Sequence, residues 1–211
     1  MTITYRYLDS PLGRLLLAAC AGALRGAWFE GQAHGPTLTA EWHEAPRDPL
    51  LDETEAQFAA WFAGTRRAFH LPLAPQGTDF QRAVWREIAR LPFGSTAAYG
   101  QVARGLGHAA AARAVGAATG RNPLSIIIPC HRLVAGNGAL TGYAGGLARK
   151  AALLRFEAGE AGAWTGARAS CASVHPPTTP WLGHTEHFAV TRDFLNNYPR
   201  RLEPLLDDET A

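Results

Sequence analysis

The segment 125–132, with the sequence Ser-Ile-Ile-Ile-Pro-Cys-His-Arg, leaves this chain few ways to fold. Its three consecutive isoleucines predict a short, fully buried strand, and Pro129 ends that strand because its ring fixes φ and removes a hydrogen-bond donor. Cys130 is therefore expected at a rigid strand end. His131 and Arg132 follow it directly, and such neighbours stabilise a thiolate, the nucleophilic form of cysteine.

Cys130 also has a plainer interpretation, which this segment alone leaves open. A lone cysteine is commonly an inert core residue, and neighbours along a strand point to opposite faces. The three cysteines, Cys20, Cys130 and Cys171, lie far apart and form no CxxC pair. Neither a disulfide framework nor a cysteine-rich zinc site is expected, and free thiols in a reducing compartment fit best.

No apolar run reaches the length of a membrane span, and residues 1–6 lack the layout of a signal peptide. A cytoplasmic protein without membrane association is therefore expected. Charge is unevenly distributed: the formal net charge is only +2, yet residues 80–155 hold ten basic side chains and one acidic side chain, Glu87. Both flanking segments are acidic overall. A basic middle segment of this kind predicts a polyanionic partner.

Residues 1–75 are predicted to form a small mixed α/β domain. Alternation of apolar and polar residues over 3–7, followed by apolar runs at 15–18 and 24–29, predicts an antiparallel meander. This part of the chain shows no pattern of chemically active residues.

A helix and a linker complete this domain. Asp48 is a typical N-cap, Pro49 suits the first helical position, and Gly64 follows the end of the apolar pattern, which predicts a helix between them. The segment 71–77 contains two prolines and a glycine and is the clearest linker in the chain.

Three helices are predicted in the basic segment. Thr78 and Gln81 form a capping box that opens the first helix, whose apolar stripe runs to residue 91. Two shorter helices follow over 99–106 and 109–119, joined by a tight turn that contains glycine. This arrangement is typical of a helix-turn-helix.

The helix predicted over 109–119 contains almost only small side chains except for Arg113. The plain interpretation is an alanine-rich helix packed tightly against a neighbour. The alternative is a surface that approaches a nucleic-acid backbone closely while one long cation projects from it. The basic character of the surrounding segment favours DNA.

A last helix is predicted over 147–158, after a glycine-rich stretch at 141–146. Glu157 lies in its final turn, where the helix dipole disfavours a carboxylate. Its position among apolar neighbours suggests a specific partner, for which a histidine would be suitable. The plain alternative is a solvated glutamate at a helix end.

A set of short motifs is spread over the second half of the chain: Phe80-Gln81, Val84-Trp85, Tyr99-Gly100-Gln101, Arg113-Ala114-Val115-Gly116, Asn122-Pro123, Ile128 to Arg132, Gly142 to Leu147 and Leu153 to Glu157. Together these motifs resemble the O6-alkylguanine-DNA alkyltransferases, also called methylated-DNA-protein-cysteine methyltransferases. The resemblance implies an α+β protein with an RNase-H-like mixed α/β domain over 1–75 and a winged-helix-like (helix-turn-helix) DNA-binding domain over 76–159 that carries the cysteine. Residues 160–211 would be an extension of unknown role.

By this resemblance Cys130 accepts an alkyl group from O6 of guanine, and less efficiently from O4 of thymine, in one irreversible displacement. His131 would deprotonate the thiol through a water, Glu157 would orient the imidazole, and Asn122 would brace the turn, which is the familiar logic of nucleophile, base and orienter. Tyr99 would donate a proton or hydrogen bond to the leaving guanine. The activity that the resemblance implies is that of a suicide methyltransferase (EC 2.1.1.63).

The resemblance also implies how DNA and the base are held. The target nucleotide must be flipped out of the duplex, and Arg113 would fill the gap from a helix docked in the minor groove without sequence preference. Tyr143 would wall the substrate pocket, with backbone groups of Leu133 and Ala144 reading the base edge. Further DNA contacts are expected from Ala112, Ala114, Gly116, Arg121 and Arg132. A monomer that needs no cofactor and no metal is implied.

The chain departs from the family pattern in two places. Ser125 replaces a proline that lines the pocket in some members, which leaves the tolerance for bulky alkyl groups open. The extension 160–211 is some fifty residues longer than expected. A helix over 185–197 is predicted in it, and a metal site is disfavoured by the proline-rich spacing of Cys171, His175, His184 and His187.

Two other classes of function compete with DNA repair. A lesion-binding sensor or transcription regulator would lack the cysteine, or would carry an added metal domain or a second sequence-reading helix-turn-helix, and the sequence shows neither feature. A thiol hydrolase would require an oxyanion-hole motif, which is not evident, and would not explain the basic segment.

Overall fold

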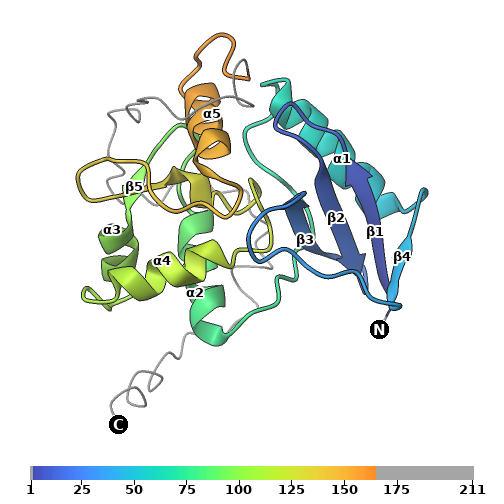
Figure 1. The fold of residues 1–211 in the computed structure, drawn as a ribbon, viewed down its shortest axis with the longest axis horizontal. Coiled ribbons are helices and arrows are strands. Elements are labelled where there is room, and N and C mark those ends of the chain that lie inside the picture. Colours follow the sequence, from blue (N-terminus) through green and yellow to red (C-terminus); the bar gives the residue numbers. More distant parts are fainter. Residues whose placement is uncertain (1, 165–211) are drawn as a thin grey trace.

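The computed structural model describes residues 2–164 (Figure 1). Its N-terminal part holds a four-stranded sheet with the strand order β3-β2-β1-β4. Strands β1, β2 and β3 pair antiparallel, which confirms the predicted meander. The short β4 was not predicted and pairs parallel to β1. The strands are β1 (Ile3–Leu8), β2 (Leu15–Cys20), β3 (Ala23–Phe29) and β4 (Trp42–Glu44).

Helix α1 (Pro49–Phe62) packs against this sheet (Figure 1). The Asp48 side chain accepts hydrogen bonds from the backbone N–H groups of Leu50 and Leu51, which confirms it as the N-cap. The helix buries Leu51 and Phe58 completely. The N-cap explains why the helix begins at Pro49, and the buried apolar residues explain which side of the helix lies against the sheet, both as the sequence predicts.

The segment 71–77 connects the two parts of the chain, but it is not a free linker. Its backbone lies along the start of β3, where Leu24 N–H donates to Pro72 O at 2.8 Å and Ala74 N–H donates to Leu24 O at 2.9 Å. Leu71 is buried. The connection is therefore part of the N-terminal sheet edge.

The C-terminal part consists of helices around a two-stranded parallel sheet formed by β5 and β6 (Figure 1). The Thr78–Gln81 capping box is present at the start of α2, as predicted. Helices α3 and α4 pack on each other and on α2. The elements are α2 (Asp79–Ala89), β5 (Ala97–Ala98), α3 (Tyr99–Gly105), α4 (Ala112–Gly120), β6 (Leu133–Val134) and α5 (Leu147–Glu157).

Helix α4 begins at Ala112, three residues later than the predicted start at 109. Residues 109–111 form a turn, and no side chain caps the helix because Ala111 occupies the N-cap position. A run of alanines carries no capping signal, so the sequence did not fix where the helix starts.

The prediction of a strand at 126–128 is wrong. These residues form a turn in which Ile126 has φ +71°, and they lead into a short 3₁₀ helix, Cys130–Arg132. The prediction of burial was right, since Ile126, Ile127 and Ile128 are all buried. A run of β-branched residues signals burial, but it does not distinguish a buried strand from another buried backbone path.

The core is continuous through both parts of the chain. One cluster of buried side chains includes Leu24 and Phe29 from β3, Trp61 from α1, Trp85 from α2 and Leu153 from α5. No helix within residues 2–164 is long and apolar enough to cross a lipid bilayer.

Candidate active site

The short sheet brings two predicted site segments together. Ala97 pairs with Leu133 and Ala98 pairs with Val134, in parallel. Tyr99 directly follows the first strand, and the 3₁₀ helix that carries Cys130 directly precedes the second. Helix α5 packs against the same 3₁₀ helix and contributes Glu157.

The Cys130 thiol is held from one side by Asn122. The Asn122 side-chain amide donates to Cys130 Sγ at 3.1 Å and to the carbonyl of Ile128 at 2.8 Å, and its own carbonyl accepts from Leu124 N–H at 3.0 Å. Asn122 therefore spans the turn before the cysteine and contacts the sulfur itself. Cys130 is 3% exposed, so few approaches to the sulfur are open.

His131 and Glu157 form a fully buried pair. His131 Nε2 lies 2.8 Å from Glu157 Oε1. An ionised carboxylate can only accept hydrogen bonds, so Nε2 carries the proton and a neutral ring keeps its lone pair on Nδ1. His131 Nδ1 is buried and has no hydrogen-bond partner within the described residues. The predicted histidine partner of Glu157 is thus present, and its free ring nitrogen can accept a proton.

Arg132 completes the environment of Glu157. Its Nε donates to Oε2 and its Nη2 donates to Oε1, both at 2.8 Å, and Gly94 N–H donates to Oε2 at 3.0 Å. Arg132 also donates to the carbonyl of Leu91. Its guanidinium is thus directed into the protein, whereas the sequence interpretation placed Arg132 among the DNA contacts. The geometry gives it another role, as the counter-ion of the acid.

These contacts set the ionisation of the three groups. Burial alone would raise the pKa of Glu157, but the charges of Arg132 and His131 and their hydrogen bonds lower it to about 2. Burial lowers the pKa of His131 from its ordinary value, and Glu157 opposes that effect only in part. Burial also raises the pKa of the Cys130 thiol, against the Asn122 hydrogen bond and the Lys150 charge. At neutral pH the resting site therefore holds a thiol, a neutral imidazole and a carboxylate.

Tyr99 and Lys150 both hold the segment after the cysteine. Tyr99 Oη donates to the carbonyls of Thr141 and Gly142, at 3.1 and 3.2 Å, and Lys150 Nζ donates to Thr141 O at 2.5 Å. Burial lowers the pKa of Lys150 to about 8, and Cys130 opposes this when its thiol is ionised. Sequence reasoning missed Lys150 as a site residue, although it is the single lysine among twenty basic residues.

The predicted pocket residues lie in this same region. The ring of Tyr143 lies close over Gly145, where an added Cβ would come within 2.7 Å of Tyr143 Cε1. Burial raises the pKa of Tyr143 well above its ordinary value, so it stays a neutral phenol. Leu133 N–H bonds to Cys130 O, and Ala144 O accepts from Ala33 N–H at 3.0 Å. Part of the backbone expected to read a base is therefore engaged within the protein.

Helix α4 presents a distinct outer face. Val115, Ala118 and Thr119 are buried, and Trp85 Nε1 donates to Ala118 O at 2.9 Å, which fixes the inner face. The predicted DNA contacts Arg113, Ala114 and Arg121 are exposed, and Ala112 and Gly116 are partly exposed. An added Cβ at Gly116 would lie 3.9 Å from the Tyr99 ring, so this face adjoins the site.

Other sequence predictions fall elsewhere. Within residues 2–164, no group of three His, Cys, Asp or Glu side chains is arranged to hold a metal ion. Cys20 and Cys130 are free thiols. The predicted helix at 185–197 and the residues Cys171, His175, His184 and His187 lie outside the described residues.

Two family profiles match the chain. The ribonuclease-like domain of 6-O-methylguanine DNA methyltransferase matches residues 3–75, and the DNA binding domain of the same family matches residues 79–159. A methylated-DNA–protein-cysteine methyltransferase of Mycolicibacterium paratuberculosis is 43% identical over 155 residues, which cover 74% of this chain and 92% of that protein. One of Methanosarcina acetivorans is 40% identical over 153 residues, covering 72% and 97%.

Solved structures agree with these matches. The crystal structure of the Mycobacterium tuberculosis O6-methylguanine methyltransferase superposes with a TM-score of 0.69 at 41% identity, covering 76% of this chain and 95% of that chain. A structure of the Mycobacterium tuberculosis protein in complex with DNA gives the same TM-score and covers 74% and 93%. The similarity runs through both domains, and the chain belongs to the 6-O-methylguanine DNA methyltransferase family.

Proposed function

We propose that Cys130 is the alkyl acceptor of a direct-reversal DNA repair protein. The substrate is duplex DNA that contains O6-alkylguanine, with O4-alkylthymine as a slower substrate. The observation that carries this proposal is the fully buried His131–Glu157 pair, whose Nε2–Oε1 distance is 2.8 Å. His131 directly follows Cys130, and the thiol of Cys130 accepts a hydrogen bond from Asn122. No other group of described residues combines a nucleophile, a base and an orienting acid in this way.

The chemistry would proceed in one displacement. His131 Nδ1 accepts the thiol proton through a bridging water, and Glu157 stabilises the imidazolium that forms. Sγ then attacks the alkyl carbon, the bond from that carbon to O6 breaks, and its electron pair stays on the guanine. Tyr99 donates a proton to the guanine anion as it leaves, which gives neutral guanine. The proton held by the His131 imidazolium then passes through solvent to the Tyr99 oxygen, so that only Cys130 ends in a changed state. The product thioether cannot regenerate the thiol, so each protein molecule acts once.

Tyr99 and Tyr143 would handle the base. Tyr99 Oη bonds to the carbonyls of Thr141 and Gly142, so it must turn from them to donate to a guanine. Burial raises the pKa of Tyr99, which keeps it protonated as a donor at neutral pH. Tyr143 walls the pocket. Backbone groups of Leu133 and Ala144 read the base edge, other than Leu133 N–H and Ala144 O, which bond within the protein.

DNA would dock on the exposed face of α4. Ala112, Ala114 and Gly116 allow a close approach to the minor groove, Arg113 enters the stack in place of the flipped base, and Arg121 contacts phosphate. All site groups come from one chain, which supports a monomer. A cytoplasmic location is supported by the need to keep the Cys130 thiol reduced.

Mass spectrometry of the intact protein and its peptides tests this function directly. The protein is mixed with duplex DNA that contains one O6-methylguanine. We expect one added methyl group, on the peptide that bears Cys130, which saturates at one per protein. An unmodified protein that still binds the lesion would instead indicate a sensor, and turnover of small esters would indicate a hydrolase.

A further inference from the structure

The turn that leads to Cys130 holds an unusual backbone conformation. Ile126 has φ +71° and is 2% exposed. A β-branched residue rarely adopts the left-handed region, and it persists there only where the surroundings hold it. Two residues later, Ile128 O accepts from the backbone N–H of Cys130 at 2.8 Å, so the shape of this turn sets where the thiol lies.

The N-terminal domain supplies the contacts just before this residue. Ser125 N–H donates to Ala27 O on β3, and Ala27 N–H donates to Pro123 O, both at 2.8 Å. The Ser125 hydroxyl donates to the side-chain carbonyl of Gln32 at 2.9 Å. Both donors of Ser125 are thus held by residues more than ninety positions earlier in the chain.

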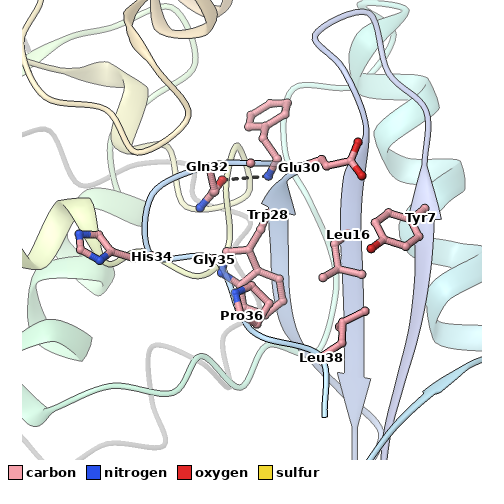
Figure 2. Close-up of a pocket in the computed structure, with 11 residues that line it drawn as sticks. Tyr7, Leu16, Trp28, Glu30, Gln32, His34, Gly35, Pro36 and Leu38 are labelled. Carbon is pink, nitrogen blue, oxygen red and sulfur yellow. Dashed lines mark hydrogen bonds between the residues drawn. The ribbon is translucent and has the colours of Figure 1, made fainter. Parts of the chain in front are cut away.

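Gln32 is itself fixed. Its Oε1 accepts a second hydrogen bond, from Phe29 N–H at 2.8 Å, and its backbone N–H donates to Phe29 O at 3.0 Å. Figure 2 shows the Gln32 side chain folded back toward β3 at the margin of a surface cavity of about 330 Å³. The residue is 8% exposed, so water does not easily replace these bonds.

The next residue contacts the opposite side of the site. Ala33 N–H donates to Ala144 O at 3.0 Å, in the segment that also carries Tyr143. Residues 32 and 33 therefore reach both chain segments around Cys130: the turn before it and the glycine-rich segment after it.

We propose that Gln32 is a positioning residue for alkyl transfer: its side-chain carbonyl holds Ser125, and through it the left-handed turn at Ile126 that places the Cys130 thiol. This inference rests on the proposed function and extends it to the ribonuclease-like domain. Loss of the carbonyl acceptor lets the turn relax and shifts the sulfur. The transfer step then slows while DNA binding, which uses α4, is unchanged.

Single-turnover kinetics on the full chain test this role. Gln32→Met keeps the side-chain length and removes the acceptor, whereas Gln32→Glu keeps an acceptor oxygen. Each variant reacts with a concentration series of O6-benzylguanine and of duplex DNA containing O6-methylguanine, so that the limiting transfer rate and the apparent affinity separate. We expect Gln32→Met to lower the limiting rate about tenfold or more with both substrates, with duplex affinity unchanged, and Gln32→Glu to restore most of the rate.

Gln57→Met is the matched control. Gln57 is also a buried glutamine of the N-terminal domain, but it bonds to both backbone groups of His70, away from Cys130. It should lower the thermal midpoint and leave the transfer rate unchanged. Ser125→Ala removes the same hydrogen bond by deleting its donor. Because both changes remove one bond, the double variant Gln32→Met/Ser125→Ala should transfer the alkyl group no more slowly than the slower of the two single variants.

The outcomes are distinct. If the wild-type protein transfers no alkyl group to Cys130, the proposed function itself is overturned. A wild-type protein that transfers, with Gln32→Met equally fast, overturns only the role of Gln32. Two further results also overturn the role of Gln32, because each indicates a general loss of structure. In the first, Gln32→Met lowers the transfer rate and Gln32→Glu does not restore it. In the second, Gln57→Met lowers the transfer rate as well. If Gln32→Met does not fold, Ser125→Ala decides by a lower limiting rate at unchanged affinity for O6-benzylguanine, because Ser125 also interacts with the pocket residue Tyr143.

Discussion

Glu157 is an acid at the end of a helix, where the dipole disfavours it, and yet its pKa is lowered to about 2. Arg132 outweighs the dipole because it offers two parallel hydrogen bonds at 2.8 Å in a site that excludes water. The acid in turn fixes the tautomer of His131. A single buried carboxylate therefore supports both the local fold and the base.

We expect Glu157→Gln to destabilise the protein, because it leaves the Arg132 guanidinium buried without a counter-ion, a change that costs about 3–5 kcal/mol. The pKa of Glu157 is depressed on folding from 4.5 to about 2, so its ionisation contributes roughly 3 kcal/mol of stability. This contribution is present above pH 4.5 and is lost as the pH falls toward 2. Urea denaturation of both proteins at pH 7 and pH 3 measures it.

Glu160→Gln is the control for this prediction, since Glu160 pairs with Arg155 at the surface. It should change the free energy of unfolding little at either pH. A difference between wild type and Glu157→Gln that stays the same at pH 7 and pH 3 would show that the charge of Glu157 does not carry the effect.

Helix α4 has two clearly different faces. Its inner face is fixed by Val115, Ala118 and Thr119, and its outer face presents Arg113 on a surface of small side chains. Nothing on that outer face contributes to the core. A change at Arg113 should therefore act on DNA and leave folding intact.

Arg113→Ala should slow repair of O6-methylguanine in duplex DNA roughly 10- to 100-fold, because the gap left by the flipped base is no longer filled. Reaction with free O6-benzylguanine needs no flipping and should be nearly unchanged. Arg47→Ala removes another exposed arginine, from the N-terminal domain, and serves as the control for lost charge. Equal losses with both substrates would contradict the role of Arg113 in flipping.

The elements also show how far the sequence could be read. Helix α1 and the capping box of α2 were predicted because a few local side chains determine their starts. The turn at 126–128 was not, because Ser125, the residue before it, is held by hydrogen bonds to Ala27 and Gln32, which no local pattern reveals.

The site shows the same division. Cys130 and Glu157 stood out by their sequence context, and the expected histidine partner was found. Arg132 was misplaced because a basic residue in a basic segment resembles a DNA contact until its distant acid is located. Gln32 gave no signal at all: a glutamine in a loop acquires its role only from the fold.

At the scale of the whole molecule, the two domains share one core. Side chains from β3, α1, α2 and α5 belong to a single buried cluster. Aromatic contacts extend across it, with ring centroids 4.9 Å apart for Trp61 and Phe156 and 4.5 Å apart for Phe156 and Trp164. Arg149 on α5 donates to Leu12 O in the N-terminal domain and to Gly145 O beside the site.

A shared core predicts that both domains unfold together. Far-UV circular dichroism follows all helices. Labelling of Cys130 by a thiol reagent, measured on the peptide that bears it because Cys20 and Cys171 are also cysteines, follows exposure of the site, since this sulfur is buried in the folded protein. In a urea titration the two midpoints should coincide. Phe156→Ala removes an aromatic contact between α5 and α1. It should reduce the free energy of unfolding by about 2 kcal/mol, less than for a fully buried phenylalanine because Phe156 is only partly buried, and so lower both midpoints together. A thiol that becomes reactive well before the helices are lost would mean that the site opens on its own, and the N-terminal domain could then not hold the turn at Ile126 in place.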